Sequence, residues 1–171
     1  MKMPWHLSYR ADPRALPLAD RHYTRQAVGS PQFVTPGRCV VLLTARANAL
    51  WVTSWPEYAQ HEWVGAWVCS IFRNESGRLS SLLIRQAVAA TRSLWPVVPA
   101  LGMITFVDPE EVRPKRDPGR CFLKAGFVPA GQTKGGLLVL QLLPDQMPEA
   151  APPLGEVGTL FASMAYAERV P

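Results

Sequence analysis

Hydrophobic and polar positions follow two different periods along this chain. Short runs rich in β-branched and aromatic residues predict strands over residues 38–45, 50–55, 63–72 and 103–107, and two more that are joined around Gly135 and Gly136. Apolar residues recur at helical spacing over residues 79–94, which predicts a helix that ends before Pro96. We expect further helices over residues 11–26, near residues 120–125 and over residues 157–167.

The order of these elements predicts an α/β fold, a single domain with a mixed central sheet flanked by helices. The 171 residues suffice for one domain, and 48% of them are hydrophobic, so the chain can bury a core. Residues 1–143 hold every predicted strand and form the expected catalytic domain. Residues 144–171 form a Pro-rich C-terminal tail with one short predicted helix, and we expect residues 144–155 to wrap the surface or stay mobile.

Composition limits the class of protein. No apolar run approaches the ~20 residues of a membrane span, and the N-terminal residues lack the apolar core of a signal peptide. We therefore expect a cytoplasmic protein with no membrane partner. The cysteines are Cys39, Cys69 and Cys121, and they form no CxxC pair. They suit reduced, buried thiols better than a disulfide framework or a structural zinc site.

The net charge of +5 is concentrated in two parts of the chain. One basic cluster consists of Arg113, Lys115, Arg116, Arg120 and Lys124, and the other of Arg10, Arg14, Arg21 and Arg25. Such clusters suit a phosphate-bearing partner, either a nucleic acid or a nucleotide cofactor. A solvated surface is the alternative, and it is the better interpretation of either cluster taken alone.

Two charged residues end predicted strands. Asp108 follows an apolar strand, so its carboxylate could accept a proton from an exocyclic amine or bind a hard metal ion. The alternative is an ordinary cap on the turn that follows. Arg73 ends the strand over residues 63–72, where its guanidinium could bind a phosphate or a carboxylate through two hydrogen bonds. It could equally form a surface ion pair with Glu75 or Glu111.

A second pair of candidates, His22 and Tyr23, lies at the edge of the helix predicted over residues 11–26. Neighbouring side chains on a helix point about 100° apart, so the two cannot both enter one core pocket. At the edge of a helix, however, the pair could offer an imidazole and a phenol to one cleft. The alternative is a surface histidine beside a core tyrosine. Ser80 and Ser81 begin the clearest predicted helix, where hydroxyls can bind a phosphate or an acyl group but also cap the helix.

Five short motifs support a resemblance to a known family. DRHYTRQ, GSPQF, FRNE with two serines opening a helix, TFVD and PGRCFLKAGF follow in this order over residues 18–143. The last motif, a helix that ends in Ala-Gly-Phe and turns into a hairpin, resembles the C-terminal half of the acyl-CoA N-acyltransferase (GNAT) fold. Together the motifs resemble the Mom family of phage DNA-modification proteins, which are GNAT-like enzymes. The resemblance implies transfer of a carbamoylmethyl-type group to the N6 amine of adenine in phage DNA, which protects against restriction.

The resemblance also implies roles for particular residues. The catalytic residues would be His22, Tyr23, Arg73 and Asp108. The helix over residues 79–94 would receive an acyl-CoA or related donor, with contacts from Asn74, Gly77, Ser80 and Ser81. The loop RNESGRLSS differs from the glycine-rich phosphate loop of the superfamily, which counts against CoA. Iron is a further cofactor that the family implies, and its N and O ligands would be His22, Tyr23 and Asp108.

A DNA-modifying enzyme needs contacts to the phosphate backbone of double-stranded DNA and access to a flipped base. The residues that we assign to backbone contacts are Arg25, Lys115, Arg116, Arg120 and Lys134. The location would be the cytoplasm of a bacterial host that carries the phage, and the oligomeric state, a dimer included, stays open. Two other functions stay open as well: a conventional GNAT N-acyltransferase that uses acetyl-CoA on a small amine or peptide, and a non-catalytic phage DNA-binding accessory protein.

Overall fold

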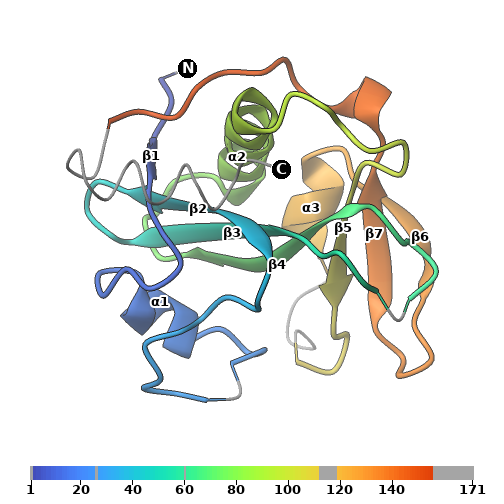
Figure 1. Cartoon of the computed structure of the whole chain (residues 1–171), viewed down its shortest axis with the longest axis horizontal. Helices are drawn as coiled ribbons and strands as arrows, with labels where there is room; N and C mark the ends of the chain where they lie inside the picture. Colours follow the sequence, from blue (N-terminus) through green and yellow to red (C-terminus); the bar gives the residue numbers. More distant parts are fainter. Residues whose placement is uncertain (1, 26, 60, 112–118, 156–171) are drawn as a thin grey trace.

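A seven-stranded mixed sheet runs through the molecule in the order β1-β2-β3-β4-β5-β7-β6 (Figure 1). The computed structural model describes residues 2–25, 27–59, 61–111 and 119–155. The strands are β1 (Trp5–Leu7), β2 (Arg38–Thr44), β3 (Ala49–Trp55), β4 (Trp67–Asn74), β5 (Met103–Val107), β6 (Val128–Gln132) and β7 (Leu138–Leu142). The helices are α1 (Leu16–Asp20), α2 (Ser80–Leu94), α3 (Arg120–Lys124) and the short 3₁₀ helix η1 (Pro144–Gln146). The expected α/β class with a mixed sheet is confirmed, whereas the helices around the sheet are few.

Most strands and the longest helix lie where the sequence predicts them. β5 spans the predicted residues, and α2 begins one residue later than expected. The strand expected over residues 63–72 begins only at Trp67, because turns precede it and Gly65 adopts φ +91°. β1 is not predicted, since a strand of three residues carries too little pattern. The helix predicted over residues 157–167 lies outside the described residues.

The prediction of a long helix over residues 11–26 is wrong, because only the five residues of α1 are helical among the described residues of that region. Asp12 does not cap a long helix, and its carboxylate instead accepts a hydrogen bond from the Arg14 N–H (2.9 Å). Pro17 has no N–H to donate to a preceding turn, so α1 begins beside it. Residues 21–24 form turns that lead the chain away from α1.

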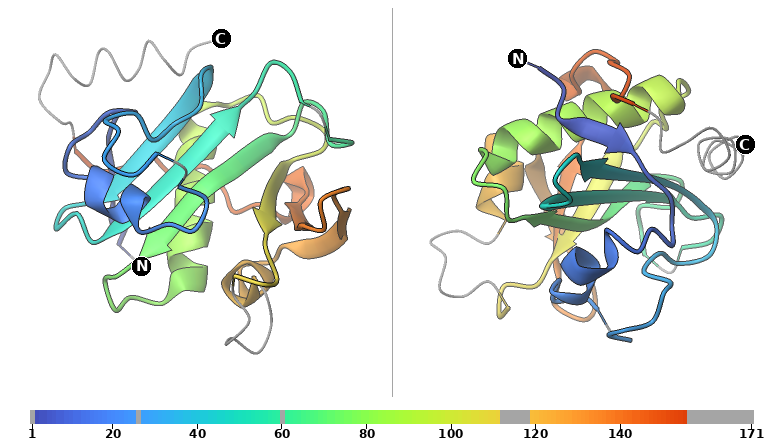
Figure 2. Two further views of the ribbon diagram at one scale, coloured as in Figure 1. Left: turned by 90° about the horizontal axis from the view of Figure 1, so that it is seen from below. Right: turned by 90° about the vertical axis from the view of Figure 1, so that its left-hand side faces the viewer.

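Helices cover the two faces of the sheet unequally (Figure 1, Figure 2). α2 and α3 pack on one face, over the larger core. This core includes the buried tryptophans Trp5, Trp51, Trp67 and Trp95. α1 packs on the other face, where Leu18 and Ala19 contact apolar residues of β2, β3 and β4. Because both faces of β2 and β3 are covered, these strands are buried along almost their whole length.

β4 contains a β-bulge in its pairing with β3. Cys69 and Ile71 pair with neighbouring residues of β3, so Ser70 is an extra residue. β4 pairs with β5, in parallel, only as far as Cys69 and Thr105, where the Thr105 hydroxyl donates to the Cys69 carbonyl oxygen (3.1 Å). A bulge bends and twists its strand. β4 and β5 therefore part beyond this point, and no backbone hydrogen bonds pair their remaining residues with each other.

Residues 144–155 continue from β7 across α2 to β1 (Figure 1). The Ala151 N–H donates to the Ala89 carbonyl oxygen (3.0 Å), and the Leu154 N–H donates to the Trp5 carbonyl oxygen (2.7 Å). Met147 is buried in the larger core. This segment therefore adds backbone hydrogen bonds and apolar area to the same core. Within the described part of the chain, no helix has the length and apolar character needed to cross a membrane.

Candidate functional site

A cleft of about 940 Å³ opens where β4 and β5 part. It has an α1 side, formed by residues 21–23 and Arg73, and an α2 side, formed by residues 77–81 and α3. α1 and α2 lie on opposite faces of the sheet (Figure 2), and the cleft is lined by residues from both of these sides. Its basic lining residues are Arg21, Arg73, Arg78, Arg120 and Lys124. Among the described residues, Glu111 is its one acidic lining residue.

The loop between β4 and α2 is organised by the side chain of Asn74. Its Oδ1 accepts hydrogen bonds from the Ser76 N–H (2.9 Å) and the Ser76 hydroxyl (2.6 Å). Its Nδ2 donates to the Arg78 carbonyl oxygen (2.7 Å) and to Ser80 Oγ (2.9 Å). Gly77 supplies the positive φ (+77°) that the turn requires. Asn74 and Ser80 therefore hold each other and the loop, whereas Ser81 lines the cleft without a part in these contacts.

α2 begins without a side-chain cap among the described residues. The N–H groups of its first turn and the dipole of this 15-residue helix favour an anion. Arg78 and Ser81 line the cleft beside these groups, and Lys124 of α3 adds positive charge on the same side. A phosphate of a nucleotide donor fits this arrangement, although the loop is not glycine-rich.

Tyr23 contacts β5 from the α1 side. Its hydroxyl donates a hydrogen bond to the Phe106 carbonyl oxygen (3.1 Å). Burial raises the pKa of Tyr23, so the phenol stays protonated at neutral pH. Its ring stacks on the ring of His22, with 4.6 Å between the centroids. Tyr23 is still 41% exposed, so the stacked pair offers an aromatic surface to a ligand.

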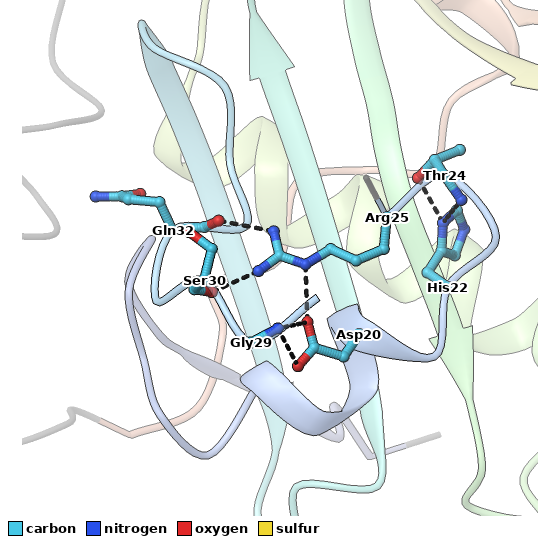
Figure 3. Close-up of polar contacts among 7 residues, drawn as sticks. All are labelled: Asp20, His22, Thr24, Arg25, Gly29, Ser30 and Gln32. Carbon is cyan, nitrogen blue, oxygen red and sulfur yellow. Dashed lines mark hydrogen bonds and ion pairs between the residues drawn. The ribbon is translucent and has the colours of Figure 1, made fainter. Parts of the chain in front are cut away.

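His22 is a neutral imidazole with one nitrogen already engaged. Burial, and then the positive charge of Arg73, lower the pKa of His22 to about 4. Its Nδ1 accepts the Thr24 N–H (3.3 Å) and lies 2.7 Å from Thr24 Oγ1 (Figure 3). Because a backbone N–H can only donate, we assign the ring proton to Nε2. His22 can therefore donate a hydrogen bond to a ligand through Nε2, but it is a weak base at neutral pH.

Arg21 and Arg73 share one carboxylate, that of Glu75. Arg21 donates through Nε and Nη2 to the two Glu75 oxygens, and Arg73 Nε donates to Oε2, each over 2.8 Å. Arg73 Nη1 also donates to the Arg21 carbonyl oxygen (3.1 Å). Hydrogen bonds from the two guanidinium groups lower the pKa of Glu75 to about 2. The ion pair with Glu75 that the sequence left open for Arg73 is present, and Arg73 lines the cleft as well.

Asp108 follows Val107, which lines the cleft, but is not itself a lining residue. Its Oδ1 accepts a hydrogen bond from the Glu110 N–H (2.9 Å), which is the turn-capping contact. The structure therefore brings His22, Tyr23 and Arg73 together in one cleft and places Asp108 one residue beyond its lining.

Each of the three residues implied as iron ligands already makes a hydrogen bond within the protein. His22 Nδ1 and Asp108 Oδ1 each accept a backbone N–H, and the Tyr23 hydroxyl donates to a carbonyl oxygen. In the described ranges, no group of three or more His, Cys, Asp or Glu side chains is placed to hold a metal ion. We therefore assign no step to iron.

Arg25, one of the residues expected to contact DNA, is engaged within the protein. Its side chain is 8% exposed, and its Nε donates to Asp20 Oδ1 (2.8 Å). Its two terminal nitrogens donate to the carbonyl oxygens of Gln32 and Ser30 (Figure 3). The Gly29 N–H donates to the same Asp20 carboxylate. These contacts hold the loop after α1 and account for Arg25 without a ligand.

Of the other residues assigned to DNA, the structure describes Arg120 and Lys134. Arg120 lines the cleft. Lys134 lies outside it, in the turn between β6 and β7. This turn is at the same end of the sheet as the cleft, because β7 begins opposite Val107 at the end of β5. Lys115 and Arg116 lie outside the described residues.

Sequence reasoning missed Arg21, Arg78 and Ser70 as parts of the site. Arg21 directly precedes His22, and Arg78 lies in the loop RNESGRLSS beside the other donor-side candidates, so both had a usable signal. Ser70 had none, because a bulge arises from the pairing of β4 with β3 and not from the residue itself.

No family model, curated protein or solved structure matches this chain. Its function is therefore to be inferred from the cleft, from the charge around it and from the chemistry of its two sides. Both sides carry groups that suit a phosphate-bearing molecule, and the aromatic stack lies on the α1 side.

Proposed function

We propose that this chain is a GNAT-like transferase that modifies DNA. It moves a small acyl or carbamoylmethyl-type group from an acyl-CoA or related donor to the N6 amine of adenine, as the resemblance to the Mom family implies. The observation that carries this proposal is the cleft between β4 and β5, which chemically different groups line from the two faces of the sheet. A donor on the α2 side and an acceptor on the α1 side would meet between the parted strands.

The α2 side supports a phosphate-bearing donor. The uncapped N–H groups of α2, together with Arg78 and Ser81, would hold its phosphates. The backbone groups of β4 beyond Cys69, which β5 does not pair, suit an extended ligand that carries amides. When bound, such a donor supplies the activated group that is transferred. Asn74 contributes by holding the loop in shape.

The α1 side supports a nucleobase as the acceptor. A base can stack on the exposed face of the Tyr23–His22 pair, and such stacking contributes about 1–3 kcal/mol per base. The N6 amine of adenine lies inside the base stack of duplex DNA, so the base must leave the helix to reach the cleft. Arg120 and Lys134, at the same end of the sheet, suit the phosphate backbone around it.

The transfer step requires a proton acceptor. A bond forms between N6 and the carbon of the transferred group, the bond between that carbon and its carrier breaks, and N6 loses one proton. We assign this proton to the Asp108 carboxylate, whose Oδ1 also accepts the Glu110 N–H. His22, with its pKa lowered to about 4, serves as a hydrogen-bond donor, and Arg73 orients the donor or the base.

Mass spectrometry of nucleosides from DNA of expressing cells tests the proposal. We expect a modified adenosine with the unaltered chain and none with Asp108→Asn, whose amide oxygen still accepts the Glu110 N–H and preserves the turn. Glu110→Gln is the matched control, because it removes a neighbouring charge and leaves the same backbone donor. Equal modification by a folded Asp108→Asn variant would remove Asp108 from the mechanism, and unmodified DNA with all three chains would contradict the function.

A second candidate is a conventional N-acyltransferase that acts on a small amine or a peptide. Glu111, the acidic lining residue, favours a cationic amine as the acceptor, and the α2 side serves this function equally well. Calorimetric titration with acetyl-CoA and with duplex DNA separates the two candidates. Binding of acetyl-CoA with no affinity for DNA at low salt supports the conventional enzyme, and salt-dependent DNA binding supports the first proposal.

A further inference from the structure

The Arg21–Glu75–Arg73 group has a feature that an ordinary surface ion pair lacks. Both arginines line the cleft, whereas Glu75, which binds both guanidinium groups, is not among its lining residues. Glu75 also donates its backbone N–H to the Asn48 carbonyl oxygen (2.7 Å), which ties it to the start of β3. The main chain of Glu75 is thus held in place, and its carboxylate binds both arginines.

Each guanidinium keeps N–H groups that these contacts do not use. An arginine has five N–H donors in a rigid planar fork. Arg21 uses Nε and Nη2, and Arg73 uses Nε and Nη1, so Nη1 of Arg21 and Nη2 of Arg73 have no hydrogen-bond partner within the described part of the chain. The side chains of Arg21 and Arg73 are 49% and 38% exposed, so water or a ligand can reach them. Two positive charges face one negative charge, which leaves the group cationic.

We propose that Arg21 and Arg73 form a phosphate-binding subsite on the α1 side, with Glu75 as the positioning residue. The subsite lies next to the aromatic stack, since His22 and Tyr23 directly follow Arg21 in the chain. It rests on the proposed function and narrows the acceptor to a nucleotide unit. The phosphate of that unit binds the two guanidinium groups through charge-assisted hydrogen bonds, and its base stacks on Tyr23.

The charges around the cleft favour this ligand. The other basic lining residues, Arg78, Arg120 and Lys124, increase the local attraction for an anion, and Glu111 alone opposes it among the described lining residues. His22 is uncharged at neutral pH. A neutral base can therefore stack on its ring, and the ring does not compete with the arginines for the phosphate.

Calorimetric titration of the full chain with dAMP and with deoxyadenosine tests the subsite. We expect dAMP to bind about tenfold more tightly than deoxyadenosine, which is the effect of one or two charge-assisted hydrogen bonds. Arg21→Gln and Arg73→Gln should each remove most of this preference, and Arg21→Lys should restore only part of it, because an ammonium lacks the planar fork. Arg46→Gln is the control for net charge, since Arg46 is exposed and does not line the cleft.

Glu75→Gln separates positioning from charge by the sign of its effect. The substitution makes the site one unit more positive, so a purely electrostatic site would bind dAMP more tightly. If Glu75 positions the arginines, dAMP binds several-fold more weakly while deoxyadenosine is unaffected. Tighter dAMP binding by this variant would overturn the positioning role.

The remaining outcomes distinguish this inference from the proposed function. Equal affinities for dAMP and deoxyadenosine overturn the subsite and leave a base-binding α1 side in place. Inorganic phosphate that competes as well as dAMP indicates a site for free anions and overturns the assignment to a nucleotide. If neither compound binds, the subsite is wrong; the proposed function fails with it only where DNA from expressing cells is also unmodified.

Discussion

His22 lies in surroundings that keep its imidazole neutral. Burial and the charge of Arg73 lower its pKa to about 4, whereas the pKa of histidine in an unfolded chain is about 6.5. Between these two pH values the unfolded chain binds more protons than the folded one. The contribution of His22 to the free energy of unfolding is therefore fully present above about pH 6.5 and decreases as the pH falls toward 4.

The Arg73→Gln variant tests the electrostatic part of this pKa. Removing the positive charge should raise the pKa of His22, but not to its unfolded value, because burial is the larger cause and remains. Titration of the imidazole resonances by NMR measures the shift. His61 is an internal control, since burial alone lowers its pKa and Arg73→Gln should leave it unchanged. An unchanged pKa of His22 would mean that the charge of Arg73 has no effect on the protonation of this ring.

The side chain of Asn74 makes four hydrogen bonds within the loop before α2, so we expect it to stabilise the fold. The Asn74→Ala variant loses four bonds within the loop before α2, so we expect the free energy of unfolding to fall by about 1–3 kcal/mol. Urea denaturation measures the difference. Ser76→Ala keeps both Asn74 Nδ2 bonds and should cost less. Equal losses in the two variants would show that the amide nitrogen of Asn74 contributes nothing to the loop.

At the scale of elements, the bend of β4 decides where the cleft lies. The strand is continuous from Trp67 to Asn74, and its apolar pattern alone predicts an ordinary central strand. The extra residue Ser70 changes which face each later side chain occupies, so that Ile71 packs in the core beneath α1 while Cys69 packs beneath α2. Arg73 consequently reaches the α1 side, where Glu75 and Arg21 bind it.

The start of β5 depends on a close approach that tolerates only glycine. At Gly102, φ is +68° and a Cβ atom would lie 2.1 Å from the Leu142 carbonyl oxygen. Gly102→Ala should therefore lower the free energy of unfolding by more than about 3 kcal/mol. Gly136→Ala is the matched control, because φ is +89° but nothing lies within 4 Å, and it should cost only about 1–2 kcal/mol. Chemical denaturation of both variants compares them, and similar costs would argue against the close approach.

At the scale of the whole molecule, residues 144–155 complete a core that the sheet and α2 begin. Met147 is buried with 8% of its surface exposed, and Arg92 donates to the Pro148 carbonyl oxygen (2.7 Å). The edge strand β1 is paired on its outer side by Leu154, which covers an edge that would otherwise be open to another strand. Residues 144–155 are thus hydrogen-bonded to the N-terminal strand β1.

Met147→Ala measures the contribution of this segment. We expect a loss of roughly 2–4 kcal/mol in the free energy of unfolding, because the buried side chain leaves a cavity. Val97→Ala, at a side chain that is 76% exposed, should change the stability by no more than about 0.5 kcal/mol. Thermal and urea denaturation compare the two. A Met147→Ala variant as stable as Val97→Ala would mean that the segment lies on the core without stabilising it.

Elements with strong local periodicity were predicted well, and those fixed by neighbours were not. α2 and β5 lie as expected, since one apolar face or one apolar run defines each. The helix over residues 11–26 was wrong, because prolines and the Asp12 carboxylate compete with helical hydrogen bonds. For the site, the three residues His22, Tyr23 and Arg73 were chosen from sequence and share a cleft. The carboxylate that fixes Arg73 appeared only as one alternative, since a sequence does not say which charge lies nearest.

The sequence by itself determined the α/β class, the central helix, most strand positions and a basic character that suits a phosphate-bearing partner. Each of these follows from residue type and spacing within about ten positions. Only the tertiary structure decided that β4 and β5 part at Ser70, that Glu75 lies between two arginines and that Arg25 faces inward. These features depend on contacts between segments that are distant in the chain. The free energy of such contacts depends on the burial of the groups and on the distances between their charges, which exist only once the chain has folded.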